Sequence, residues 1–159
     1  MAIYVVYLLL IAVCTALQHT WPAWLLLWGS PPDLALAAVV CVALTGGPVL
    51  GCYTGFCAGL LVGSTESALL GGYFIAYMGT GTALGWVRGS LFADRVMVAV
   101  LVVLCAAPIV DVVRLIFAPP ASPGPWVVQT IVGAPYSALA AVPMYLIVRG
   151  ITDRLLERD

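Results

Sequence analysis

The sequence has no lysine, one histidine and few charges of either sign. Charged residues make up 8% of its 159 residues, against about 25% in an ordinary globular domain. Such a chain cannot coat a water-facing surface. Its net charge is −1 and it has no basic run, so we expect no nucleic-acid partner. One histidine and no C-x-x-C pair leave no set of ligands for a metal site.

The residues needed for catalysis inside a membrane are also scarce. A serine protease needs a serine with a histidine base, but the chain contains no G-x-S-G and only His19. An aspartyl protease needs two facing aspartates. Asp33 and Asp111 are the only aspartates associated with apolar segments, and both lie near predicted segment ends. We therefore expect no enzymatic activity, no cofactor and no metal.

Apolar residues are abundant, at 64% of the chain. This composition predicts an integral membrane protein of the all-α class, forming one domain over residues 1–159. Six membrane spans are expected, at about 2–19, 33–45, 48–63, 69–87, 96–117 and 126–148. The second and third are shorter than the roughly 20 residues of a full crossing. Two short spans are favoured over a re-entrant hairpin.

The loops and the charges add two expectations. Four prolines between residues 118 and 125 predict a loop without regular helix. In a chain with six spans, five of the six arginines fall on the side of the two termini: Arg88, Arg95, Arg149, Arg154 and Arg158. Because cytoplasmic loops carry an excess of basic residues, both termini are predicted to be cytoplasmic.

Glycine recurs at every fourth residue along the third span. The members of this series are Gly47, Gly51, Gly55, Gly59 and Gly63, and a second strip in the fourth span contains Gly81, Gly85 and Gly89. This spacing puts the glycines on one helix face, where another helix can approach closely. We therefore predict close helix packing there. The spacing leaves open whether the neighbouring helix belongs to this chain or to another protein.

Four ionisable residues are further candidates for partner binding or packing. Asp33 follows two prolines and precedes an apolar run, as a helix N-cap does, although it could also contact a partner. Asp111 and Arg114 are three residues apart, so they can pair within one helix or dock a partner helix. Glu66 lies in a polar Ser-Thr-Glu-Ser segment and is either a solvated loop residue or part of a site.

Short motifs in the second and third spans resemble those of the rod shape-determining protein MreD family. They are Pro-Asp-Leu at residues 32–34, Gly-Gly-Pro at 46–48 and Gly-Phe-x-x-Gly-Leu-Leu at 55–61. The length, the six expected spans and the short charged tail are also similar. The family commonly has an acidic residue shortly after Gly-Leu-Leu, where this chain has Gly63. Glu66 is the candidate to replace it.

This resemblance implies a non-enzymatic component of the bacterial elongation (rod) complex in the inner membrane. Its partners would be a bitopic MreC-like protein and, beyond it, RodA, a penicillin-binding transpeptidase and MreB. Its role would be cell-shape determination and lateral peptidoglycan synthesis.

The helical arrangement of that family is similar to the substrate-binding subunits of energy-coupling-factor vitamin transporters. These subunits supply the alternative hypothesis. Ala12-x-x-x-Ala16 is similar to their docking motif. A solute pocket needs several convergent polar groups, and the spans contain few, so the sequence favours a scaffold.

Overall fold

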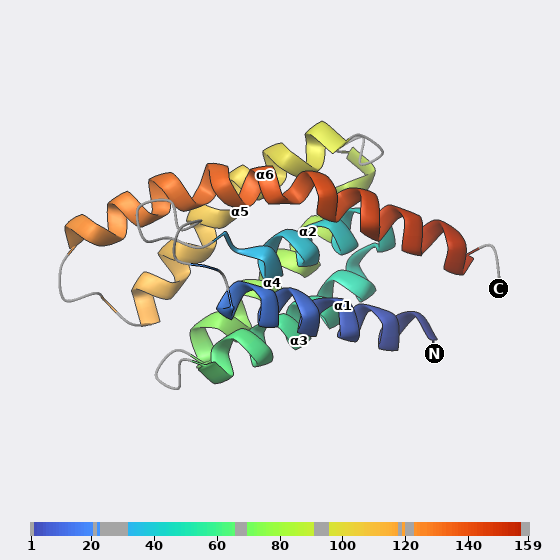
Figure 1. Ribbon diagram of the computed structural model, residues 1–159, viewed down its shortest axis with the longest axis horizontal. Helices are drawn as coiled ribbons and strands as arrows, with labels where there is room; N and C mark the ends of the chain where they lie inside the picture. The colour runs from blue at the N-terminus through green and yellow to red at the C-terminus, as the bar shows by residue number, and fades with distance from the viewer. Residues whose placement is uncertain are drawn as a thin grey trace.

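The computed structural model describes residues 2–20, 22, 32–65, 70–90, 96–117, 119 and 123–156, and the regular structure in them is entirely helical. The all-α prediction is confirmed (Figure 1). The elements are α1 (Ala2–His19), α2 (Leu34–Gly46), α3 (Pro48–Thr65), α4 (Leu70–Val87), the 3₁₀-helix η2 (Arg88–Ser90), α5 (Val96–Phe117) and α6 (Pro123–Leu156).

Three of these helices are long and apolar enough to cross a membrane. They are Pro48–Thr65, Val96–Phe117 and the Trp126–Arg154 part of α6. Two further apolar helices, Ile3–His19 and Leu34–Gly46, are shorter. Together with the composition, these helices indicate a membrane protein.

The turn between α2 and α3 consists of one residue outside helix, Gly47. Its φ of 88° is in the left-handed region, which glycine adopts without the steric cost of a side chain. The Gly47 N–H donates a 3.0 Å hydrogen bond to the Ala43 carbonyl oxygen and so closes the end of α2. Pro48 then opens α3 at the position where the N–H of a residue has no acceptor within the helix.

Helix α6 differs from the prediction at its start. It begins at Pro123, inside the segment that was predicted to lack helix, and it continues to Leu156, beyond the predicted end of the span at residue 148. Pro123 and Pro125 are tolerated because they occupy the first helical turn. At the other end, Arg149 and Asp153 pair across one turn at 3.8 Å. The 34 residues of α6 span about 51 Å, well over the roughly 30 Å of a bilayer core.

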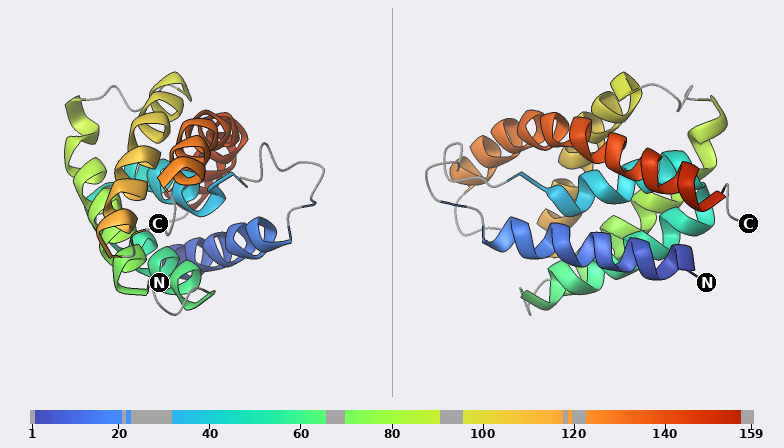
Figure 2. Two further views of the ribbon diagram at one scale, coloured as in Figure 1. Left: turned by 90° about the vertical axis from the view of Figure 1, so that its left-hand side faces the viewer. Right: turned by 45° about the vertical axis from the view of Figure 1, so that its right-hand side comes forward.

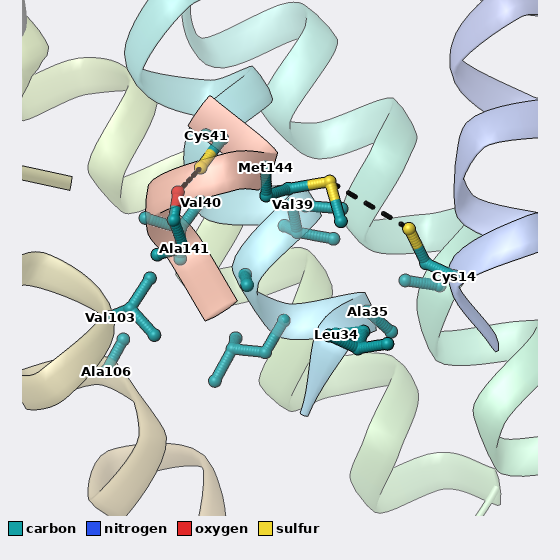
Figure 3. Packing of buried hydrophobic residues seen from close by; sticks show 14 of the residues in the cluster. Cys14, Leu34, Ala35, Val39, Val40, Cys41, Val103, Ala106, Ala141 and Met144 are labelled. Atoms are coloured by element: carbon teal, nitrogen blue, oxygen red, sulfur yellow. Dashed lines mark hydrogen bonds between the residues drawn. The ribbon is translucent and has the colours of Figure 1, made fainter. Parts of the chain in front are cut away.

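Helix α2 is the centre of the molecule. Every residue from Leu34 to Leu44 is buried, and α2 contacts all five other α-helices. Figure 3 shows part of this packing, in which the Cys41 thiol lies 3.9 Å from the Ala141 carbonyl oxygen of α6. A helix that is apolar all round lies in a protein core or in lipid, and here protein surrounds it on every side. Because neighbours surround it, α2 can remain about 20 Å long, shorter than a full crossing.

The start of α1 and the end of α6 lie at the same end of the bundle (Figures 1 and 2). We call this the terminal end; it also contains the turn between α2 and α3, and η2 contacts the end of α2 there. The opposite, distal end contains the end of α1 and the starts of α2 and α4. Successive helices therefore run in alternating directions between the two ends.

Candidate functional site

Five polar side chains meet at the distal end of the bundle. This distal polar cluster consists of Asp33, Tyr73, Tyr77, Asp111 and Arg114. They come from the start of α2, from α4 and from α5. Ionisable groups inside a membrane protein are costly, which makes such a cluster the first place to seek a function.

Asp33 is the residue that ties α2 into this cluster. Its Oδ1 accepts a 2.9 Å hydrogen bond from the Leu36 N–H, which is the predicted N-cap interaction. Its Oδ2 accepts a 2.5 Å hydrogen bond from the Tyr77 hydroxyl of α4. The Asp33 N–H donates to the Ser137 Oγ of α6 at 2.8 Å. One residue therefore fixes the start of α2 against two other helices.

Arg114 has the corresponding role for α5. Its Nη1 donates to Asp111 Oδ1 at 3.0 Å, and its Nη2 donates to the Tyr73 hydroxyl at 2.5 Å. The guanidinium carbon also lies 4.5 Å from the centroid of the Tyr73 ring, in cation–π range. The side chains of Arg114 and Asp111 are 31% and 24% exposed, so solvent or headgroups weaken their attraction only in part.

The two tyrosines join these halves. Tyr73 and Tyr77 are four residues apart on α4, and their ring centroids are 6.0 Å apart. The cluster is thus a continuous chain of contacts from Asp33 through Tyr77 and Tyr73 to Arg114. Throughout the described part of the chain, no buried side-chain nitrogen or oxygen lacks a hydrogen-bond partner. No group of three histidine, cysteine, aspartate or glutamate residues there could hold a metal ion.

Sequence reasoning found part of this site. It singled out Asp33 and the pair of Asp111 with Arg114, but gave no reason to bring them together. It missed Tyr73 and Ser137. The available signal was the four-residue spacing of Tyr73 and Tyr77, which puts both side chains on one helix face. Because a buried tyrosine hydroxyl needs a polar partner, this spacing indicates that polar groups gather beside that face. Glu66 lies outside the described residues.

The glycine series, apart from Gly47 in the turn before α3, forms the interface between α3 and α4, so the neighbouring helix belongs to this chain. A Cβ added to Gly51 would lie 2.3 Å from the Gly81 carbonyl oxygen, and one added to Gly81 would lie 2.2 Å from the Gly51 oxygen. A Cβ on Gly55 would lie 2.4 Å from the carbonyl oxygen of Tyr77. The obstructing atoms are backbone atoms, which cannot rotate away, so no side chain fits at these positions.

The contact continues toward both ends of the two helices. A Cβ on Gly85 would lie 2.4 Å from Pro48 Cα, and one on Gly59 would lie 2.7 Å from the Cα of Phe74. Gly63 is less tightly packed, with 3.1 Å to Leu70 Cα. Gly89 has no such neighbour within 4 Å, so the second strip contributes through Gly81 and Gly85 only.

The opposite side of α4 borders an apolar groove of about 660 Å³ between α4 and α5. Its lining is aliphatic except for Thr80 and Cys105. Gly79 also lines it, and a Cβ added there would meet no atom within 4 Å. This glycine has no packing role within the described structure.

A scan against protein-family models finds no match for this chain, and searches of curated proteins and of solved structures find none either.

Proposed function

We propose that the chain is a multi-pass protein of the bacterial inner membrane with six spans and both termini in the cytoplasm. The alternating direction of the helices supports this topology. So does the distribution of charge, because Arg88, Arg149 and Arg154 belong to the terminal end whereas Arg114 belongs to the distal end. The terminal end is the cytoplasmic end in this proposal.

We further propose that it is a non-enzymatic scaffold of the elongation (rod) complex, similar to MreD, that binds an MreC-like bitopic protein. The observation that carries this proposal is the contrast between the buried polar side chains of the chain and the apolar groove on α4 and α5. The described buried polar side chains already have hydrogen-bond partners within the chain, while the groove on α4 and α5 is apolar and open. Such surfaces suit contacts with other membrane helices better than contacts with polar solutes.

Co-expression with an MreC-like protein from the same bacterium tests the scaffold. We expect a stable complex after purification in mild detergent, with a defined stoichiometry by native mass spectrometry. In that assay Asp33→Ala is expected to weaken the complex more than Glu66→Ala. Failure of the folded chain to bind any MreC-like protein would reject the scaffold. Links to RodA, the transpeptidase and MreB would follow through the MreC-like partner.

The distal polar cluster favours one alternative, a substrate-binding subunit of an energy-coupling-factor type vitamin transporter. Asp33, Tyr77 and Arg114 converge at the end that faces outward in the proposed topology. Against this alternative, these groups already have partners within the chain. Co-purification of a small molecule together with an ATPase module would favour transport over the scaffold.

A further inference from the structure

Helices α4 and α5 contact each other near the distal end through Arg114 and Phe117. Along the middle of both helices the groove separates them, from Val98 and Leu84 to Val113 and Ile75. Immediately beyond Val113, Arg114 reaches across to the Tyr73 hydroxyl. One turn further, the Phe117 side chain packs against α4, where a Cβ on Gly72 would lie 3.1 Å from Phe117 Cβ. The Arg114–Tyr73 bridge thus joins α4 and α5 just beyond Val113 and Ile75, the last residues that line the groove at its distal end.

The same bridge is one step in the chain of contacts that begins at α2. Asp33 bonds to Tyr77, the Tyr77 ring packs against the Tyr73 ring, and Tyr73 accepts from Arg114. Asp33 therefore acts on α5 through α4. Contiguous side-chain contacts of this kind can carry a coupling free energy between two sites, provided that one element has two arrangements.

We propose that the chain from Asp33 through Tyr77 and Tyr73 to Arg114 is a latch that couples the start of α2 to the separation of α4 and α5. With the latch intact, the distal part of α5 is held against α4 and the groove is closed at that end. When any link is lost, the distal part of α5 moves away from α4 and the groove opens there. Arg114 and Tyr73 are positioning residues in this device.

Helix α5 is suited to be the moving element. Five of its residues are buried, namely Ala99, Val103, Ala106, Ala107 and Val110. Several of its other large side chains are exposed, including Leu101 at 58% and Ile109 at 59%, whereas others such as Val100 are half-buried against the core. Helix α4, in contrast, is fixed to α3 by backbone contacts that leave no room to slide. A change in the latch is therefore expected to displace α5 rather than α4.

Pulsed electron paramagnetic resonance in lipid nanodiscs tests the latch. Spin labels are attached through noncanonical amino acids, which leaves the native cysteines in place. The distal pair is Gly71 and Ile116, and the terminal pair is Trp86 and Met97. A Cβ on Gly71 would meet nothing within 4 Å, while Ile116, Trp86 and Met97 are 73%, 78% and 73% exposed.

The decisive variant is Asp33→Asn, which keeps an N-cap side chain and does not touch α5 directly. We expect the distal pair to gain a population at longer distance in Asp33→Asn, in Tyr73→Phe and in Arg114→Gln, while the terminal pair is unchanged. The matched control is Tyr7→Phe. It removes another buried hydrogen bond between helices, the 2.6 Å bond to Thr152 near the terminal end, and should leave the distal pair unchanged.

Two outcomes would overturn the proposal. In the first, the distance within the distal pair changes in Arg114→Gln but not in Asp33→Asn, which would show that Asp33 is not coupled to α5. In the second, this distance changes in none of the three variants, which would show that there is no latch. If Arg114→Gln changes the distances of both labelled pairs because the whole bundle loosens, the distances in the milder Tyr73→Phe variant decide whether the latch exists. The latch does not depend on the identity of any partner, so it can fail or succeed independently of the scaffold.

Discussion

Helix α4 meets its two neighbours in different ways. Toward α3, glycines on both helices bring backbone against backbone, so that Gly51 and Gly81 exclude even a methyl group from each other. Toward α5, a groove of about 660 Å³ lies between the helices, and a polar bridge from Arg114 to Tyr73 joins them beyond one end of it. The first interface is specified by shape alone. The second depends on a few polar contacts, and so it can be altered by small chemical changes.

The largest effect is expected from filling the first interface. In Gly55→Leu the new side chain would collide with the backbone of Tyr77 and Met78, and the cost should exceed about 3 kcal/mol of unfolding free energy. Thermal unfolding followed by circular dichroism in detergent measures it. Gly71→Leu is the control, since that position is open. Similar melting of the two variants would refute the tight interface.

The next effect concerns the anchor of α2 on α4. Asp33→Ala removes the N-cap and leaves the Tyr77 hydroxyl buried without its acceptor. The expected loss is about 2–4 kcal/mol. Asp33→Asn should lose less because its amide oxygen can still accept the N-cap bond from the Leu36 N–H, so that only the carboxylate acceptor of the Tyr77 hydroxyl is lost. Equal stability of Asp33→Ala and the unchanged protein, measured by chemical unfolding, would show that the cluster contributes nothing to folding.

A smaller effect is expected at the bridge between α4 and α5. Arg114→Gln removes a charge that is partly exposed, so we expect a loss of about 1–2 kcal/mol. The control is Arg149→Gln, which breaks an exposed pair with Asp153 and should change stability by less than about 0.5 kcal/mol. A loss at Arg149 as large as at Arg114 would mean that burial in the cluster gives no advantage.

A still smaller effect than at Arg114 is expected at the terminal end of α4. The exposed Arg88 donates from Nη1 to the Thr45 carbonyl oxygen at 2.9 Å, near the end of α2. Arg88→Gln should therefore cost only about 0.5–1 kcal/mol. Its melting temperature should fall between those of Arg149→Gln and Arg114→Gln. A larger loss than at Arg114 would show that this contact, and not the bridge, holds α4 in place.

The two interfaces also differ in how far the sequence predicts them. The four-residue glycine spacing indicates close packing, because few other reasons place so many glycines on one helix face. Apolar pattern alone could not assign the neighbour, since lipid and protein interior are equally apolar. For the same reason the sequence could not distinguish the enclosed α2 from a lipid-facing helix.

The distal polar cluster was harder to predict. Its local interactions follow from spacing: Asp33 caps α2, and Asp111 pairs with Arg114 one turn away. Its long-range contacts join residues 44 and 41 positions apart, Asp33 with Tyr77 and Tyr73 with Arg114. No local pattern specifies such pairs, because they depend on how three helices are placed. The start of α6 differs from the prediction because Pro123 and Pro125 lie in the first helical turn, where proline is tolerated.

One measurement tests the difference between the two sides of α4 most directly. The same substitution is made at two neighbouring positions, Gly81→Ala and Gly79→Ala, and both unfolding free energies are compared with that of the unchanged protein. At Gly81 the new methyl would lie 2.2 Å from the Gly51 oxygen, so stability should fall. At Gly79 the methyl enters open space, and the gain in helix propensity should raise stability by up to about 1 kcal/mol. Opposite signs are predicted; the same sign and size at both positions would contradict the account.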